Sequence, residues 1–345
     1  MGASAAWMAR SFSGVVISER SQTARWRKPS GAPADTGRDR HATSSEPRVT
    51  IPPPADGVDA YDLDARRVRR HAARAAAGYD SAAWLPRRIA EALMEHLDPV
   101  RIRPRRVLDV GAGTGVCARL LERRYAGARV TCVDSAPAML RVARGRGPRW
   151  LSRCAQACGD ALHLPIADAS IDLLVSSLML PSCPSPQPVF AEFARVLKPE
   201  GLVMFASLGP DTLKELRASW AEVDARVHVH AFIDMHDLGD ALVRVGLRDV
   251  VMDVERIDAE YADAAALMRE LKQLGASNAA RGCASGLTTR ARMRALAAAY
   301  ERRRNGAGLP ATFEVVFGHA WRAAPARVEF PLRDLAPSRR PAPGA

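Results

Sequence analysis

Four short apolar runs alternate with helical patterns through the middle of the chain. The runs read RRVLDVG, ARVTCVD, IDLLVSS and GLVMFASL, and each predicts a strand. Between them, apolar residues recur at spacings of three and four near 115–125, 136–144 and 187–197, which predicts helices. Strands that alternate with helices favour parallel pairing, so the pattern predicts an α/β fold with a doubly wound, mostly parallel sheet.

Helical patterns also flank this core. Upstream, apolar residues recur at helical spacing over 62–97. Downstream, we expect two more strands at RDVVMDVE and ATFEVVFGHAW, and helices near 211–224, 235–245, 263–274 and 288–303. We therefore predict one domain over residues 61–330, with a core at about 100–208 and a helical cover at about 210–305.

The two ends of the chain differ from this domain in composition. Residues 1–60 are rich in Ser, Pro, Gly, Ala and Arg, and the last residues read PSRRPAPGA. Segments with little to bury stay disordered, so we predict a disordered extension over 1–60 and a disordered tail over 331–345. The first 28 residues hold five basic residues and one acid, as a transit peptide would, but a bacterial tail or a mis-assigned start is favoured.

The net charge of +12 and the isoelectric point near 10.1 raise the question of a nucleic-acid partner. Only four of the 50 basic residues are lysines, which leaves 46 arginines beside abundant Ala, Gly and Pro. Such a bias is typical of GC-rich coding and raises charge without selecting a polyanion. We therefore expect no nucleic-acid partner, while docking to an acidic protein stays open.

Cysteine spacing and hydropathy bear on metals, membranes and location. The six cysteines include no CxxC pair, so we predict reduced thiols, no metal site and a cytoplasmic location. No stretch approaches the roughly 18 to 20 consecutive apolar residues that a membrane-spanning helix needs. We therefore expect no membrane association.

The stretch RVLDVGAGTGVCARLL, residues 106–121, places three glycines in five residues between a strand and a helix. Its G-x-G-x-G spacing is shorter than the G-x-G-x-x-G of the dinucleotide fingerprint. Amides at a helix N-terminus can hold one small anion, such as an amino-acid carboxylate. Asp109 beside them can accept from an ammonium group, and this combination suits the methionine end of S-adenosylmethionine.

Two more acids stand where a nucleoside would need them. Asp134 ends the second strand, where a carboxylate can accept from both ribose hydroxyls. Asp160 in GDALHLP can accept from an adenine amino group, with Ala161 supplying a backbone amide. Alone, Asp134 would be a helix cap and Asp160 a turn acid, but their order and spacing together indicate a cofactor site.

With these motifs, the core resembles class I S-adenosylmethionine-dependent methyltransferases. The resemblance implies a Rossmann-like, seven-stranded and mostly parallel sheet with an antiparallel seventh strand, and S-adenosyl-L-methionine as cofactor. It also implies a set of cofactor-binding residues around the glycine stretch: Asp109, Gly111, Ala112, Gly113, Gly115, Asp134, Ser135, Met139, Asp160, Ala161 and Ser176.

The flanking segments carry a second and narrower resemblance. LGPDTLKELRASWAEVD, HVHAFIDMHDLGDALVRVGLRDVVMDVE, MRELKQLGASN and LPATFEVVFGHAW follow one another in order. Over about residues 66–327 the chain is similar to the malonyl-[acyl-carrier protein] O-methyltransferases. This implies methylation of the free carboxylate of a malonyl thioester, early in pimelate and biotin synthesis. The implied partner is an acidic acyl-carrier protein bearing malonyl, or malonyl-coenzyme A, and we expect a monomer.

Four residues are candidates for catalysis or for substrate binding. Tyr79 in AAGYD matches a position near the reacting methyl group in the family, which makes it the catalytic candidate. Arg269 and Lys272 lie three apart on one predicted helix and could contact the carboxylate or the carrier protein. His228 could orient the substrate. A solvated helix face for the first pair and a structural role for His228 are the alternatives.

The sequence departs from the family pattern after the fourth strand. Ser177 and the pair Pro181-Ser182 stand where the family usually reads an Asn and then Gln-Trp. The loop borders the reacting methyl group, so substrate identity and catalytic competence depend on it. Two alternatives stay open: an arginine hydroxylase-like assembly factor for respiratory complex I, and a non-catalytic S-adenosylmethionine-binding paralogue.

Overall fold

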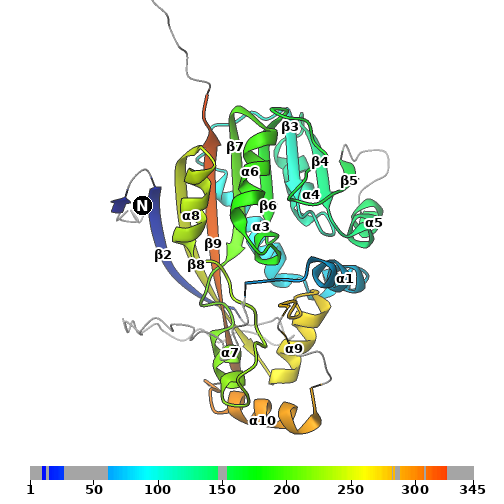
Figure 1. Cartoon of the computed structure of the whole chain (residues 1–345), viewed down its shortest axis with the longest axis vertical. Coiled ribbons are helices and arrows are strands. Elements are labelled where there is room, and N and C mark those ends of the chain that lie inside the picture. Colours follow the sequence, from blue (N-terminus) through cyan, green and yellow to red (C-terminus); the bar gives the residue numbers. More distant parts are fainter. Residues whose placement is uncertain are drawn as a thin grey trace, which may run out of the picture.

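The computed structural model describes residues 10–12, 15–26, 61–146, 154–281, 283, 288–306 and 308–324. Its strands form one sheet in the order β1-β2-β8-β9-β7-β6-β3-β4-β5 (Figure 1). The strands are β1 (Arg10–Phe12), β2 (Val15–Trp26), β3 (Arg106–Val110), β4 (Arg129–Asp134), β5 (Ala155–Cys158), β6 (Ile171–Ser177), β7 (Leu197–Leu208), β8 (Leu247–Tyr261) and β9 (Leu309–Arg322).

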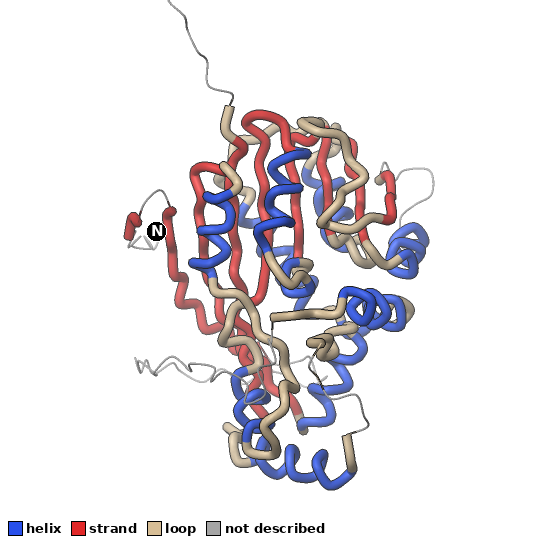
Figure 2. The backbone as a smooth tube through the Cα atoms, viewed as in Figure 1, coloured by secondary structure: helices blue, strands red, loops and turns tan. Residues whose placement is uncertain are grey.

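Helices lie on both faces of the sheet and below one end of it (Figures 1 and 2). The helices are α1 (Ala65–Ala75), α2 (Tyr79–Ala82), α3 (Trp84–His96), α4 (Val116–Arg124), α5 (Pro137–Arg146), η1 (Leu180–Ser182), α6 (Pro186–Val196), α7 (Lys214–Ala221), α8 (Met235–Arg244), α9 (Ala264–Gln273) and α10 (Arg290–Glu301). None of the described helices is long and apolar enough to cross a membrane.

The sheet confirms the predicted α/β class. β3 pairs in parallel with β4 and β6, β4 pairs in parallel with β5, and β6 with β7. β9 runs antiparallel between β7 and β8. The seven strands from β8 to β5 therefore form the mostly parallel sheet with one antiparallel strand that the resemblance implied.

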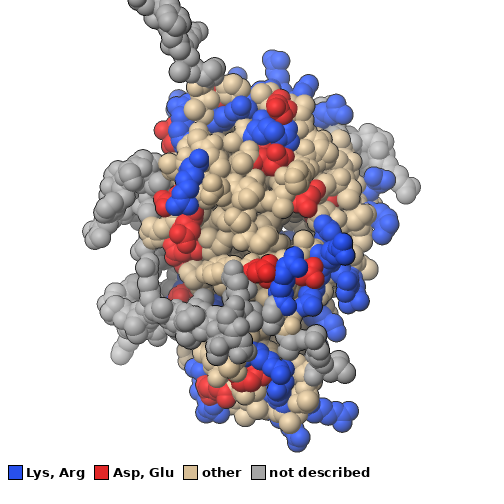
Figure 3. Space-filling model, viewed as in Figure 1, with Lys and Arg blue, Asp and Glu red and all other residues tan. Residues whose placement is uncertain are grey.

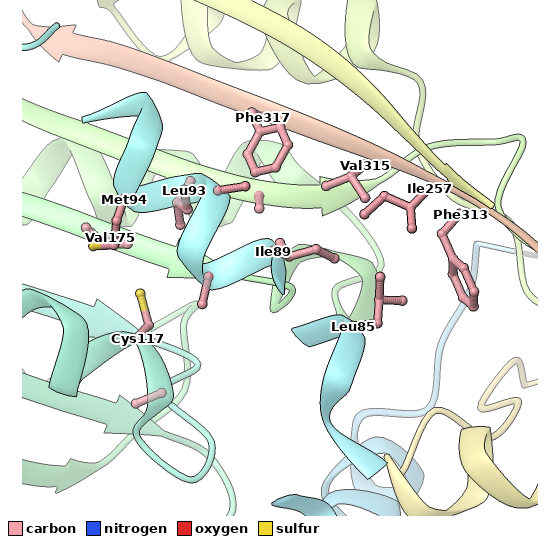
Figure 4. Packing of buried hydrophobic residues seen from close by; sticks show 14 of the residues in the cluster. Leu85, Ile89, Leu93, Met94, Cys117, Val175, Ile257, Phe313, Val315 and Phe317 are labelled. Atoms are coloured by element: carbon pink, nitrogen blue, oxygen red, sulfur yellow. The ribbon is translucent and has the colours of Figure 1, made fainter. Parts of the chain in front are cut away.

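The central strand is buried on both faces because helices cover both. Val107 and Leu108 of β3 have no exposed surface although their side chains point to opposite faces. On one face Ile89 of α3 packs in a cluster with Val175 and Phe317 of the sheet (Figure 4). On the other face the apolar residues of α6 and α8 pack in a second cluster. A doubly wound core results.

The segment predicted as a helical cover has two parts. α7, α9 and α10 lie below the main body of the sheet with the lower ends of β8 and β9 (Figure 1). α8 instead packs beside α6 on the sheet, and β8 is part of the sheet itself. α7, α9 and α10 are therefore the helices that can cover the ends of the central strands.

The amino-terminal extension differs from the expectation of disorder over 1–60. β2 pairs in parallel with β8, in a register that begins at Val15 and Val250, and β1 pairs antiparallel with β2. An added strand satisfies backbone groups of β8 that an exposed edge would leave unpaired. Amino-acid composition does not predict this strand pairing, because the pairing is made by backbone groups. The other residues of 1–60, and the expected tail 331–345, lie outside the described residues.

Candidate active site

A cavity of about 500 Å³ lies where the central strands end. Gly111 directly follows β3 and Asp134 ends β4, and both line the cavity. α1 and α9 supply other parts of its wall, including Arg69 and Lys272. In open α/β sheets, ligands bind at the carboxyl ends of the strands, so the cavity occupies the place that this fold reserves for a ligand.

The glycine loop needs its glycines for two physical reasons. Gly111, Gly113 and Gly115 have φ of 76°, 53° and 78°, a left-handed region that residues with a side chain adopt at a cost. A Cβ on Gly111 would lie 2.4 Å from the Cβ of Met179, whereas one on Gly113 would meet nothing within 4 Å. Gly113 therefore leaves open space that a ligand can enter, and Gly111 permits close packing behind it.

This difference predicts unequal effects of two matched substitutions. Gly113→Ala should lower the free energy of unfolding by about 1 to 2 kcal/mol, because only the left-handed φ is strained. Gly111→Ala should lower it by about 1 to 3 kcal/mol more, since Met179 must also move. Urea unfolding of both variants measures the difference, and equal losses would contradict the close approach of Met179 to Gly111.

Asp134 is both a cap and a cavity residue. Its carboxylate accepts hydrogen bonds from the backbone amides of Gly113 and Ala136, each at 2.8 Å. Burial raises the pKa of Asp134, and the two amide bonds oppose that rise. The carboxylate thus fixes the glycine loop against the start of α5 while facing the cavity.

Asp109 lies behind the cavity rather than in its wall. It is 1% exposed, and neither carboxylate oxygen has a partner in hydrogen-bond geometry among the described residues. Burial raises the pKa of Asp109 to about 7. An unpartnered buried carboxylate beside the glycine loop favours a positive charge nearby, such as the ammonium group of the expected cofactor.

The predicted cofactor residues form two groups, those that line the cavity and those that lie behind its wall. Lining the cavity are Gly111, Gly113, Asp134, Ser135, Met139, Asp160 and Ala161. Set back from it are Asp109, Ala112, Gly115 and Ser176. Ser176 is fully buried and donates its hydroxyl to the carbonyl of Val110 at 3.0 Å, so it ties β6 to β3. Gly115 serves as the left-handed residue that starts α4.

Tyr79 lies in the cavity wall next to the cofactor residues. It packs with Met139 in a small apolar cluster, and burial together with the charges of Asp80 and Asp134 raises its pKa to about 12. The phenol therefore stays neutral at neutral pH and does not act as a base. Its partly buried ring is placed to exclude water from the cavity.

Two side chains at this end of the cavity escaped the sequence analysis. Asp80 accepts a hydrogen bond from the hydroxyl of Thr114 at 2.6 Å and pairs with Arg146 at 3.0 Å, which joins α2 to the glycine loop. Arg69 of α1 lies 3.9 Å from Asp160, and both line the cavity. Asp80 directly follows the catalytic candidate Tyr79, and this adjacency was the available signal.

The substrate candidates on the cover are only partly brought together. His228 and Lys272 line the cavity, whereas Arg269 is exposed and does not. Met268, Leu271 and Lys272 turn one face of α9 to the cavity, and Arg269 stands about 100° round the helix from Met268. The ring of His228 stacks on Trp220 with the ring centroids 3.6 Å apart, and its Nε2 forms a hydrogen bond with Asp224 Oδ1 at 2.7 Å. Structural contacts therefore hold the ring in place.

Comparison with known proteins places this geometry in a family. The family model of a methyltransferase domain matches residues 108–205. The malonyl-[acyl-carrier protein] O-methyltransferase of Laribacter hongkongensis is 50% identical over 274 residues, which cover 77% of this chain and 92% of that protein. The chain belongs to the malonyl-[acyl-carrier protein] O-methyltransferase family.

Further relatives agree with this assignment. The malonyl-[acyl-carrier protein] O-methyltransferase of a Methylovorus species is 46% identical, covering 79% of this chain and 94% of that protein. A bifunctional biotin biosynthesis protein of Cellvibrio japonicus is 39% identical over 74% of this chain, and the match spans 50% of that protein. The YcgJ protein of Bacillus subtilis shares the fold, with a TM-score of 0.50 and 17% identity over 68% of this chain and 99% of that one.

Within the malonyl-[acyl-carrier protein] O-methyltransferase family, the departures noted in the sequence fall on the cavity. Ser177, Pro181 and Ser182 all line it, between the glycine loop and the cover. These residues therefore change the wall that a substrate meets. Among the described residues, no group of His, Cys, Asp and Glu could hold a metal ion.

The cavity fits the cofactor of this methyltransferase family, S-adenosylmethionine. Open space lies at Gly113, a carboxylate stands at the end of β4, and the orphaned carboxylate of Asp109 lies behind the loop. A zwitterion with an attached nucleoside requires this combination of donors, acceptors and negative charge.

Proposed function

We propose that the chain transfers the methyl group of S-adenosylmethionine to the free carboxylate of a malonyl thioester. The carrier of the thioester is an acyl-carrier protein, and the product is the malonyl-[acyl-carrier protein] methyl ester of early biotin synthesis. The observation on which the proposal rests is sequence similarity. The chain is 50% identical to a malonyl-[acyl-carrier protein] O-methyltransferase, and the match covers 92% of that protein. The cavity supports the proposal because it joins the cofactor loop to two cationic side chains, Arg69 of α1 and Lys272 of the cover.

The reaction requires little proton transfer by groups of the protein. Bound S-adenosylmethionine supplies an electrophilic methyl group. A malonyl carboxylate is already ionised near neutral pH, so no general base is needed to create the nucleophile. The residues must instead align the reactants and exclude water, which fits the neutral, partly buried Tyr79 in the cavity wall.

Two cations can hold the carboxylate. Arg69 and Lys272 are the arginine and the lysine in the described wall of the cavity. Arg69 already faces Asp160 at 3.9 Å. Lys272 makes no ion pair with the described residues, and it extends from α9 on the cover side. Lys272 is therefore the stronger candidate for the substrate carboxylate.

Activity on defined thioesters tests the proposal. Purified full-length protein is incubated with S-adenosylmethionine and malonyl-carrier protein, and methyl ester formation is followed by mass spectrometry. Formation of the ester, and rescue of biotin-free growth in a strain lacking this methyltransferase, are expected. A protein that binds the cofactor but methylates neither malonyl-carrier protein nor malonyl-coenzyme A would overturn the proposal.

Lys272 and Arg269 provide a matched pair for the role of the cover. Lys272→Ala should raise KM for the small thioester malonyl-pantetheine about tenfold, as expected for the loss of one charge-assisted contact. Arg269→Ala, on the same helix but outside the cavity, should leave that KM unchanged. Steady-state kinetics measure KM for both variants. Equal KM values for the two variants would contradict a place for Lys272 in the substrate site.

A further inference from the structure

Two neighbouring helices at the cavity contain no acidic residue. Each other described α-helix, α2, α3, α4 and α6 to α10, carries at least one Asp or Glu. α1 reads ARRVRRHAARA and α5 reads PAMLRVARGR, and the two helices contact each other. Both also reach the cavity, through Val68 and Arg69 of α1 and Met139 of α5. The two helices thus carry positive charge that no acidic residue within them balances.

Five arginines of these two contacting helices are exposed. We call them together the α1–α5 arginine surface: Arg66, Arg70, Arg74, Arg141 and Arg144. Within the part of the chain that the structure describes, no acid pairs with any of them. Figure 3 shows blue Lys and Arg atoms gathered at the corresponding edge of the molecule.

The remaining arginines of the two helices are already engaged. Arg67 donates to the thiol of Cys283, Arg69 faces Asp160, and Arg146 pairs with Asp80. Elsewhere, surface arginines commonly have acidic neighbours, as Arg302 and Arg303 do in Glu222. Arg290 and Arg294 of α10 also lack an ion pair with the described residues, but that helix contains Glu301. The α1–α5 arginine surface is therefore distinguished by unpaired arginines on two helices that contain no acidic residue.

We infer that the α1–α5 arginine surface docks the acidic carrier protein that presents the malonyl arm. This inference rests on the proposed function. One side of α1 lines the cavity, and the arginines stand on the exposed remainder of the same helix. A docked partner is thus separated from the cavity by about one helix diameter, roughly 10 to 12 Å. A flexible thioester arm can pass such a rim to reach the cofactor end.

α9 is the weaker docking element. It offers two exposed cations, Arg269 and Lys272, and Lys272 is turned to the cavity. Its acid Glu270 is buried and accepts from Trp84 at 2.5 Å and from Tyr261 at 2.7 Å, which anchors the helix to α3 and β8. α9 thus serves to hold Lys272 over the cavity, while α1 and α5 meet the protein partner.

Matched charge reversals test the inference. Arg70→Glu/Arg74→Glu reverses two exposed arginines four apart on α1, and Arg290→Glu/Arg294→Glu makes the same change on α10 at the lower end of the molecule (Figure 1). At low salt the α1 variant should raise KM for malonyl-carrier protein about tenfold or more, with turnover at saturation within about twofold. The α10 variant should leave both parameters unchanged.

A substrate without a carrier separates docking from chemistry. Malonyl-pantetheine carries the arm but no protein, so its KM should be the same for the wild type and the α1 variant. Added salt should reduce the difference between these two proteins on the carrier substrate, because exposed charges are screened. Thermal unfolding and cofactor affinity of the variants confirm that the fold is kept.

The outcomes are distinguishable. If the wild type methylates neither thioester, the proposed function fails. If the wild type is active and the α1 variant keeps its KM for the carrier, the docking inference is overturned, and a rise confined to Arg269→Glu, which lies outside the cavity wall, would place docking on α9. Duplex DNA binding that is lost in the α1 variant without any change in carrier KM would also overturn the inference, in favour of a nucleic-acid surface.

Discussion

Replacing Asp109 by Asn is expected to stabilise the cofactor-free protein at pH 8 by up to about 4 kcal/mol relative to its effect at pH 4. Folded Asp109 keeps its proton up to about pH 7, because burial disfavours the charged carboxylate. An unfolded aspartate releases its proton near pH 4. The folded state therefore binds more protons between pH 4 and 7, and rising pH costs about 1.4 kcal/mol per unit over three units. An asparagine has no such cost.

Urea unfolding of the wild type and the variant across pH 4 to 8 measures this difference. Asp172 offers a control of opposite sign, because its pKa is lowered: burial acts to raise it, but Lys198 and the amides of Arg105 and Arg106 together outweigh burial. Asp172→Asn should destabilise at pH 7, and that loss should fade as the pH falls below about 4. A constant stability difference between Asp109→Asn and wild type at every pH would contradict the buried, unpartnered carboxylate.

The sheet core was predictable from sequence because its burial is periodic and local. Val107, Leu108 and Val110 lie in a central strand that helices cover on both faces, so the strand reads as an apolar run that only Asp109 interrupts. The helices between the strands carry apolar residues at helical spacing for the same reason. The pairing of β2 with β8 has no such signature, because it depends on free backbone groups of a strand more than 200 residues away.

The cavity wall was predictable where it follows from backbone geometry. Gly111 and Gly113 follow β3 and Asp134 ends β4, and parallel strands bring their carboxyl ends to one edge. Ser176 shows the limit of this reasoning. It follows the apolar run of β6 in the right place, but its side chain points into the core and bonds Val110 instead of facing the cavity.

Residues contributed by distant elements escaped the sequence analysis. Arg69 lies among several similar arginines of α1, and nothing in the sequence says which of them faces the cavity. Lys272 and Arg269 were equivalent candidates until the orientation of α9 separated them. That orientation depends on the buried contacts of Glu270 with Trp84 and Tyr261, which are tertiary and not local.

These observations give the cavity two ends with different electrostatic demands. Asp134 and Asp160 line the cofactor end, and Lys272 lines the cover. Arg69 stands beside Asp160 at the junction. Under the proposed function, a cationic sulfonium cofactor and an anionic carboxylate substrate would be drawn to different walls, which favours the alignment that methyl transfer requires. The effect of removing a charge should accordingly depend on the end from which it is removed.

Replacing Asp134 by Ala is expected to weaken S-adenosylmethionine binding by about 10- to 150-fold. The proposed role of its carboxylate is to accept from two ribose hydroxyls, and a lost hydrogen bond to a charged group costs about 1.5 to 3 kcal/mol. Asp134 also holds the amides of Gly113 and Ala136, so its loss loosens the loop that meets the cofactor. Asp134→Asn keeps an acceptor oxygen for these amides and should give a smaller loss.

Calorimetric titration of the cofactor into both variants measures the loss, with thermal unfolding as the check on folding. Asp237→Ala is the matched control, because Asp237 lies in the first turn of α8 and outside the cavity wall, and its cofactor affinity should equal that of the wild type. Asp160→Ala should fall between the two, since the Asp160 side chain is 46% exposed and water competes for its contacts. Unchanged affinity in a folded Asp134→Ala variant would remove Asp134 from the cofactor site, and the amide contacts would then be its whole role.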